Sequence, residues 1–209
     1  MKNELNKYGQ YKSDIFKKLS YKFASGKKVL DLGCGDGSDS EILINVYKLK
    51  VSGVDVYKHP QIKKNKNLKF KLGSIYKIPF ENETFDYVYL HDVLHYIDEV
   101  NQSRQKHIEG LLELKRVTKK DGTVIIIEGN RYNPLFYPHM VKMLGHNHFK
   151  QAYFLDLIRQ VFVGARFKHF ESHSYPQKFL WFWKMYETIM EKFSPKSLLA
   201  YNVAIIKKK

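Results

Sequence analysis

Apolar and polar positions along the chain follow two different periods. Short apolar runs of strand length alternate with longer segments in which apolar residues recur every three or four positions. This alternation of strands and helices predicts an α/β fold with a parallel sheet. The predicted strands are KVLDLG (28–33), KVSGVDV (50–56), LKFKLG (68–73), FDYVYLH (85–91) and TVIIIEG (123–129), with two more at about 166–174 and 201–207.

Helical periodicity fills the segments between the strands. Residues 38–49 are predicted as an amphipathic helix with Ser38 as its N-cap. Further helices are expected at 103–118 and at about 151–163, and KKDG (119–122) is expected to form a turn before the fifth strand. The 209 residues suffice for one good hydrophobic core, so we expect a single domain spanning the whole chain, 1–209.

Three segments lie outside this alternating pattern. Residues 1–25 are predicted as an N-terminal helical segment, and 130–151 and 176–195 as insertions on the substrate side. Within 176–195, apolar and aromatic side chains surround much of a helix. Such a helix is either packed on two sides, as core or as a lid, or lies at a membrane interface.

The first predicted strand runs into a glycine-rich turn, VLDLGCGDG (29–37). Glycine lets backbone N–H groups approach a ligand closely, so this strand–turn–helix unit predicts a binding loop. The nicotinamide-type fingerprint G-x-G-x-x-G is not met, because Ser38 stands at the third glycine position. A triphosphate-binding loop is also disfavoured, because Gly37 is followed by Ser38 and Asp39 with no lysine.

An acidic residue, Asp55, ends the second strand 18 residues after Gly37. A carboxylate in this place can accept both hydroxyl groups of a ribose. The alternative is a structural aspartate that caps a turn. The combination with the glycine loop favours the ribose role.

Four blocks in order, VLDLGCGDG, the strand-end Asp55, residues 73–97 and residues 113–130, resemble class I S-adenosylmethionine-dependent methyltransferases, closest to the methyltransferase type 11 group. The resemblance covers about residues 25–130. It implies a Rossmann-like, seven-stranded, mostly parallel sheet with helices on both faces and an antiparallel last strand. It also implies S-adenosylmethionine as cofactor and S-adenosylhomocysteine as product.

The resemblance also assigns cofactor-binding residues. Residues of the glycine loop would surround the methionine part, Asp55 would hold the ribose, Val56 would pack on the adenine, and His91 would lie beside the methionine end. The family often has an acidic residue after the third strand, where this chain has Ser74, so the backbone of Ile75 is expected to serve the adenine instead. The full predicted set is Asp31, Gly33, Cys34, Gly35, Gly37, Asp55, Val56, Ser74, Ile75 and His91.

Candidate catalytic residues follow the fourth strand, where open α/β sheets place their chemistry. His91, Asp92 and His95 could serve a hydroxyl acceptor as proton acceptors, and the alternative for each is a structural, hydrogen-bonded role. Methyltransferases of adenine or glutamine amides carry N-P-P-[YF] at this point, where this chain has LHDV (90–93), so that class is disfavoured. Residues 146–148 form an H-x-H pair, but with no matching carboxylate signature we expect no metal site.

Charge adds a second substrate hypothesis. The formal net charge of +15 attracts phosphate groups, which allows RNA or an anionic membrane as partner. Lysine outnumbers arginine 31 to 5, however, whereas bidentate phosphate recognition favours arginine. Nucleic acid is therefore the less favoured partner.

The cellular location is predicted from the N-terminal sequence, the length of the apolar runs and the cysteine content. The N-terminal sequence lacks the apolar core of a signal peptide, and no run approaches the roughly 18 apolar residues of a membrane span. The one cysteine, Cys34, permits no internal disulfide. We expect a soluble, cytoplasmic protein of open oligomeric state that makes at most peripheral membrane contact.

The sequence thus favours a methyltransferase that acts on an oxygen or nitrogen atom of a small-molecule or lipid/glycan-type acceptor. Two alternatives remain open: an RNA methyltransferase, and a cofactor-binding but inactive partner subunit. The identity of the acceptor, its attacking atom and the need for a general base are left open.

Overall fold

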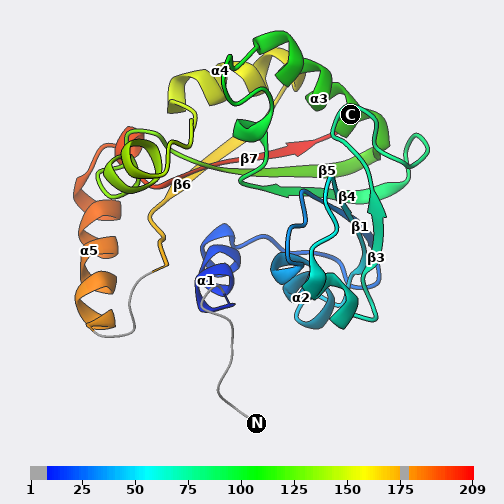
Figure 1. The fold of residues 1–209 in the computed structure, drawn as a ribbon, viewed down its shortest axis with the longest axis horizontal. Coiled ribbons are helices and arrows are strands. Elements are labelled where there is room, and N and C mark those ends of the chain that lie inside the picture. Colours follow the sequence, from blue (N-terminus) through cyan, green and yellow to red (C-terminus); the bar gives the residue numbers. More distant parts are fainter. Residues whose placement is uncertain (1–8, 175–178) are drawn as a thin grey trace.

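The computed structural model describes residues 9–174 and 179–209, and its centre is one seven-stranded sheet (Figure 1). The strand order is β3-β2-β1-β4-β5-β7-β6. β7 pairs antiparallel with both β5 and β6, and the other pairs are parallel, as the sequence predicts. The strands are β1 (Lys28–Leu32), β2 (Lys50–Asp55), β3 (Lys69–Leu72), β4 (Phe85–His91), β5 (Thr118–Gly129), β6 (Arg166–Phe170) and β7 (Tyr201–Lys207).

Helices cover both faces of this sheet. In Figure 1, α3 and α4 lie above the sheet, and α1 and α2 lie below it. The α-helices are α1 (Gly9–Leu19), α2 (Ser38–Asn45), α3 (Arg104–Val117), α4 (Gln151–Val161) and α5 (Leu180–Phe193). Short helical turns span Pro60–Lys64, Leu94–Tyr96 and Lys196–Leu198, and Tyr137–Met143 forms a π-helix.

The two covered faces explain why the central strands are so rich in branched apolar residues. Along β5, Val124 and Ile126 belong to the core between the sheet and α3 and α4. Ile125 and Ile127 belong to the core between the sheet and α1 and α2. All four side chains are fully buried. A strand that is buried on both faces has no polar face, and the sequence therefore shows an apolar run instead of an alternating pattern.

Three local predictions are wrong. Ser38 is not the N-cap of α2: Gly37 precedes the helix with φ +85°, and the backbone N–H of Ser38 donates to the Asp36 carboxylate. Residues 119–122 lie within β5, which begins at Thr118. Residues 129–149, for which the sequence predicts an irregular stretch, include the π-helix.

Helix α5 presents several of its large apolar side chains to solvent, whereas its Met190 is buried. Trp181 is 69% exposed and Phe193 is 72% exposed. The polar side of the helix faces α1 instead, where Lys18 Nζ lies 2.9 Å from the Glu187 carboxylate. The described part of the helix therefore packs on the protein through the side that carries Glu187 and Met190, and not on two sides. Residues 177–178 lie outside the described residues.

The described helices are too short or too polar to cross a bilayer.

Candidate active site

A cavity of about 540 Å³ opens at the carboxyl ends of β1, β2 and β4. Because these strands are parallel, the loops that follow them meet at one edge of the sheet. The cavity is lined by Leu32, Gly33, Gly35, Asp55, Val56, Gly73, Ser74, Ile75, Tyr76, Asp92, Val93, Tyr96, Ile97 and Asp98. Six of the predicted cofactor residues are in this lining, and they come from three separate loops.

The glycine loop depends on left-handed backbone conformations. Gly33 has φ +71°, and a Cβ on this residue would lie 2.4 Å from a methyl group of Val93. The backbone N–H of Gly33 donates to the Val54 carbonyl at 2.7 Å, which ties the loop to the end of β2. Gly35 has φ +50°, and no atom lies within 4 Å of the place of its missing Cβ. The backbone of the loop is therefore open to a ligand at Gly35.

Asp55 joins the glycine loop to the loop after β2. Its Oδ2 accepts a hydrogen bond from the Gly35 N–H at 2.9 Å, and its Oδ1 accepts one from the Tyr57 N–H at 3.1 Å. The second bond is that of a turn aspartate, the alternative role considered from the sequence. The carboxylate is only partly buried and lines the cavity, so it keeps acceptor capacity for a ligand.

Four predicted cofactor residues do not line this cavity. The Cys34 side chain is buried, and its Sγ would lie 2.9 Å from a Cβ atom added to Gly53. Burial raises the pKa of the Cys34 thiol. Gly37 sits at the start of α2 beside Ile62. Asp31 and His91 are buried beneath the loop, at 2% and 6% exposure.

Asp31 is a buried carboxyl group. Its Oδ2 accepts a hydrogen bond from the Ser40 hydroxyl at 2.5 Å. Burial, together with the negative charge of Asp39, raises the pKa of Asp31 to about 7. A positive charge placed near it would favour the ionised form.

A second cavity, of about 520 Å³, adjoins the first at Asp92. It is formed by α1, the segment 135–146, residues 173–174 after β6 and the start of β7, and it is lined by aromatic, aliphatic and histidine side chains. Its lining is Tyr11, Lys12, Asp92, Leu135, Phe136, His139, Met140, Leu144, His146, His173, Ser174 and Tyr201. The predicted insertion 130–151 therefore does contribute to a cavity.

Asp92 is the residue that both linings share. It follows β4 with φ +55°, and its Oδ1 accepts a hydrogen bond from the Gly129 N–H at 2.9 Å. The Tyr201 hydroxyl donates to its Oδ2 at 3.3 Å. Burial raises the pKa of Asp92, but the nearby histidines and Lys12 outweigh burial and leave the pKa below its usual value. The carboxylate is therefore anionic at neutral pH.

His91 belongs to a buried polar cluster behind Asp92. Its Nδ1 lies 2.9 Å from Asp39 Oδ2 and 2.8 Å from Lys12 Nζ, and its Nε2 lies 3.6 Å from Asp92 Oδ2. Lys12 Nζ also lies 2.9 Å from Asp39 Oδ2. Burial opposes ionisation of both partners, yet their attraction lowers the pKa of Asp39 and raises that of Lys12. The cluster holds β4, α1 and α2 together at the sheet edge.

His95, the third catalytic candidate, lies on the other side of Asp92. Its Nδ1 pairs with Glu128 Oε2 at 2.8 Å, and one ligand atom each of His95, Asp92 and His148 lies within 4.8 Å of the others. The structure thus brings the three predicted catalytic residues together around Asp92.

Several residues of this region were missed from the sequence. Tyr11 and Lys12 come from α1, about 80 residues before Asp92 in the chain, and no motif marks them. Val93, Tyr96 and Asp98 lie within the segment 73–97 or directly after it, so their position after the fourth strand was the available signal.

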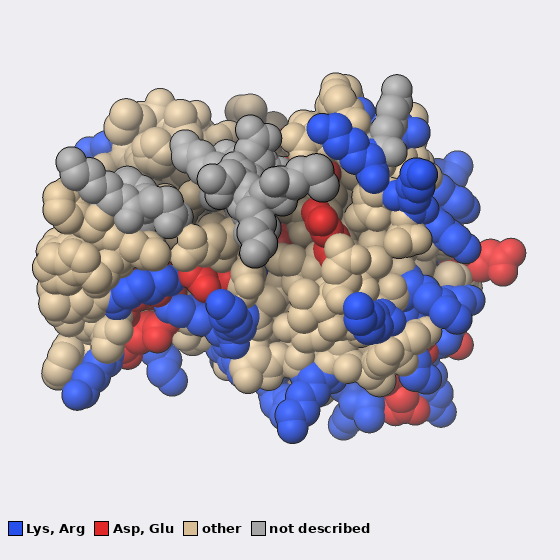
Figure 2. Space-filling model, turned by 90° about the horizontal axis from the view of Figure 1, so that it is seen from below, with Lys and Arg blue, Asp and Glu red and all other residues tan. Residues whose placement is uncertain are grey.

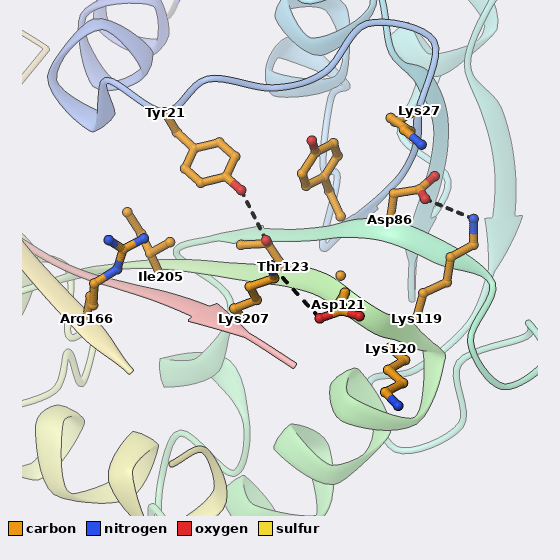
Figure 3. A pocket seen from close by; sticks show the side chains of 12 residues that line it. Tyr21, Lys27, Asp86, Lys119, Lys120, Asp121, Thr123, Arg166, Ile205 and Lys207 are labelled. Atoms are coloured by element: carbon orange, nitrogen blue, oxygen red, sulfur yellow. Dashed lines mark hydrogen bonds and ion pairs between the residues drawn. The ribbon is translucent and has the colours of Figure 1, made fainter. Parts of the chain in front are cut away.

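Basic side chains gather at the opposite end of the strands. A pocket of about 420 Å³ at the amino ends of β4 and β5 contains Lys27, Lys119, Lys120, Arg166 and Lys207 (Figure 3). Asp86 pairs with Lys119 at 2.9 Å in this pocket.

Figure 2 shows Lys and Arg scattered over the face seen from below, with acidic side chains visible in a hollow near its centre. Among the described residues, the linings of the two cavities at the carboxyl ends contain one lysine and no arginine.

Comparison with known proteins supplies the family. A family model described as "Methyltransferase domain" matches residues 30–126, which include the glycine loop, Asp55 and the whole of β4. These 97 of the 209 residues are thus similar to a methyltransferase domain. An uncharacterized methyltransferase of Schizosaccharomyces pombe is 36% identical over 129 residues, which are 53% of this chain and 43% of that protein. The chain thus spans less than half the length of this curated relative.

Solved structures share the fold of the methyltransferase domain. A putative methyltransferase in complex with the Trm112 methyltransferase activator of Haloferax volcanii matches with a TM-score of 0.69 at 13% identity, over 97% of this chain and 92% of that chain. Phosphoethanolamine N-methyltransferase 2 of Haemonchus contortus, in complex with S-adenosyl-L-methionine, matches with a TM-score of 0.62 at 16% identity, over 95% of this chain and 52% of that chain.

The methyltransferase match divides the site into two parts. The lining of the first cavity lies wholly within residues 30–126. Of the second lining, only Asp92 lies within the match. The family match therefore covers the whole lining of the first cavity and, of the second lining, only Asp92.

Proposed function

We propose that the protein transfers the methyl group of S-adenosylmethionine to an oxygen or nitrogen atom of a small-molecule or lipid/glycan-type acceptor. The observation that carries the proposal is the pair of adjoining cavities with Asp92 in their common wall. Methyl transfer from a sulfonium is an in-line displacement, which needs a donor site and an acceptor site in contact.

The first cavity is the proposed cofactor site. Asp55 would accept the ribose hydroxyls, Val56 and Ile75 would pack on the adenine, and the open backbone at Gly35 would admit the methionine part. Asp31, beneath the loop, would attract the ammonium group of that part through its carboxylate. The family match and the cofactor in the Haemonchus contortus structure support this assignment.

The second cavity is the proposed acceptor site. About 520 Å³ is a volume suited to a small molecule or to the reactive end of a larger one. Apolar side chains such as Phe136 and Met140 would contact the hydrocarbon part of the acceptor, while Lys12 and the histidines would contact its polar groups. This mixture favours an amphipathic acceptor.

In the proposed reaction the acceptor atom forms a bond to the methyl carbon while the carbon–sulfur bond breaks, and S-adenosylhomocysteine leaves with the electron pair. The anionic Asp92 would accept a hydrogen bond from the acceptor hydroxyl or amine and so orient its lone pair towards the methyl group. His91 would keep the Asp92 carboxylate in position from the buried side, because His91 Nε2 lies 3.6 Å from Asp92 Oδ2. His91 is thus proposed as a positioning residue.

RNA is the less favoured acceptor. An RNA methyltransferase needs cations around the mouth of its site to contact phosphates. The pocket with five basic side chains lies at the opposite end of the strands. Among the described residues, the linings of the two adjoining cavities contain one lysine and no arginine. Exposed Trp181 and Phe193 on α5 support peripheral contact with a membrane, which would bring a lipid-type acceptor to the protein.

The test uses methyl-labelled S-adenosylmethionine, the purified protein and a cell extract from the source organism. Label is then counted separately in the RNA, protein, lipid and small-molecule fractions. The proposal expects label in lipids or small molecules, lost in Asp92→Asn. Label in RNA alone would overturn the acceptor class. Cofactor binding without any label would favour the inactive partner subunit, and an activator would be sought, as in the Haloferax volcanii complex.

A further inference from the structure

We propose that Asp92, His95 and His148 form a binding site for one divalent transition-metal ion, with Zn²⁺ as the best match. One ligand atom from each of the three side chains lies within 4.8 Å of the other two. Two imidazoles and one carboxylate are a donor set that suits Zn²⁺, Co²⁺ or Fe²⁺ better than Mg²⁺ or Ca²⁺, which prefer oxygen ligands.

His95 is held as a metal-ligating histidine is held. Its side chain is buried, and its Nδ1 pairs with Glu128 Oε2 at 2.8 Å. Glu128 is itself fully buried and accepts hydrogen bonds from the N–H groups of Val93 and Leu94. The Nε2 of His95 has no hydrogen-bond partner among the described residues. A carboxylate on one ring nitrogen directs the lone pair of the other nitrogen towards a metal.

His148 is an unpartnered polar side chain inside the protein. It is 2% exposed, and neither ring nitrogen has a hydrogen-bond partner among the described residues. Its ring centroid lies 4.2 Å from that of His95. A buried imidazole without partners costs free energy that a metal ion would offset.

Asp92 completes the cluster from the shared wall of the two cavities. Its Oδ1 is fixed by the Gly129 N–H, and the side chain keeps 27% exposure. Ligands of a tetrahedral zinc ion lie about 3.3 Å apart, so small side-chain movements would draw the three atoms together. Three protein ligands leave the fourth position open, and here it would face the cavities at Asp92, as in catalytic zinc sites.

The geometry differs from the H-x-H pair seen in the sequence. His146 Nδ1 lies 3.3 Å from Glu99 and belongs to no described cluster of ligands. His148 lies instead near Asp92 and His95, which come about 50 positions earlier in the chain. If the proposed methyl transfer is correct, an ion at this point would bind the acceptor hydroxyl or amine and favour its deprotonation. Metal binding itself does not rest on the methyl-transfer proposal.

The test is a titration of the metal-free full-length protein with Zn²⁺ alone, in competition with a chromophoric chelator and without cofactor or acceptor. We expect one tight ion per chain, and an affinity at least tenfold lower in His148→Gln and in Asp92→Asn. His139→Gln is the matched control: it lines the second cavity but lies outside the cluster, so it should retain the ion.

Two further results decide the proposal. Co²⁺ bound to the wild-type protein should show the visible absorption of a four- or five-coordinate site, absent in the near-isosteric Asp92→Asn, whose folding is checked by circular dichroism. The proposal is overturned if the wild-type protein binds no stoichiometric ion, or if His148→Gln and Asp92→Asn bind Zn²⁺ as tightly as His139→Gln. Cofactor binding measured in parallel separates this failure from failure of the methyl-transfer proposal.

Discussion

Nε2 of His91 lies 3.6 Å from Oδ2 of Asp92, and these adjacent residues point into different surroundings. His91 is buried against Asp39 and Lys12, whereas Asp92 lines both cavities. The left-handed backbone of Asp92, at φ +55°, makes this division possible, because it turns the chain sharply at the end of β4. A charged carboxylate is thereby placed between the proposed donor and acceptor sites.

Asp92→Asn tests that placement. We expect the rate of label transfer to fall about a hundredfold, because the neutral amide orients the acceptor less well and accepts no proton. Affinity for S-adenosylmethionine should change less than about threefold. Both are measured, by label counting and by calorimetry. Asp98→Asn is the matched control, because Asp98 lines only the first cavity. Equal losses of rate in the two variants would contradict a special role for Asp92.

The raised pKa of Asp31 predicts a pH-dependent cofactor affinity. The ammonium group of S-adenosylmethionine favours the ionised carboxylate, so binding below the pKa of about 7 must release a proton. Affinity should therefore rise with pH by close to tenfold per unit below about pH 7 and level off above it. Calorimetry between pH 5.5 and pH 8.5 measures this dependence. Asp31→Asn should show a flat profile, and an unchanged slope in that variant would show that another group is responsible.

Gly33→Ala should destabilise the fold far more than Gly35→Ala. At Gly33 the new methyl group would lie 2.4 Å from Val93 Cγ2 in a left-handed conformation, whereas the space at Gly35 is open. We expect losses of about 3 kcal/mol and about 1 kcal/mol in the free energy of unfolding. Urea denaturation gives both values. Equal losses would mean that the close packing of Gly33 against Val93 contributes little.

The exposed aromatic side chains of α5 predict binding to lipid surfaces. Wild-type protein should sediment with anionic vesicles at low salt, and the double variant Trp181→Ala/Phe193→Ala should sediment at least fivefold less with an unchanged melting temperature. Val163→Ala is the control, because Val163 is 86% exposed but lies outside α5. The prediction of membrane contact through α5 is wrong if the wild-type protein stays in the supernatant.

The sheet could be predicted from the sequence because burial on both faces leaves a strong local signal. Within β5 every position from Val124 to Ile127 is apolar, and helical periodicity resumes where a strand ends. The glycine loop and Asp55 were also predictable, since one strand–turn–helix unit and the next strand place them together. Both features depend on residues close in the sequence.

The second cavity could not be predicted in this way. It joins Lys12, Asp92, His139 and Tyr201, which only the folded chain brings together. The environment of α5 was equally hidden, because an apolar helix surface has the same pattern whether it is covered or exposed. The cluster of Asp92, His95 and His148 also depends on tertiary contact. The sequence shows only the H-x-H pair of His146 and His148, from which no metal site is expected.

The most direct test of the central claim is calorimetric titration of the protein with S-adenosylmethionine. We predict one bound molecule per chain, with affinity at least tenfold lower in Asp55→Ala, which loses the proposed ribose contact. Asp156→Ala, on the exposed side of α4, should bind like the wild-type protein. Absence of binding to the wild-type protein, or equal affinity in Asp55→Ala, would contradict the assignment of the first cavity as the cofactor site.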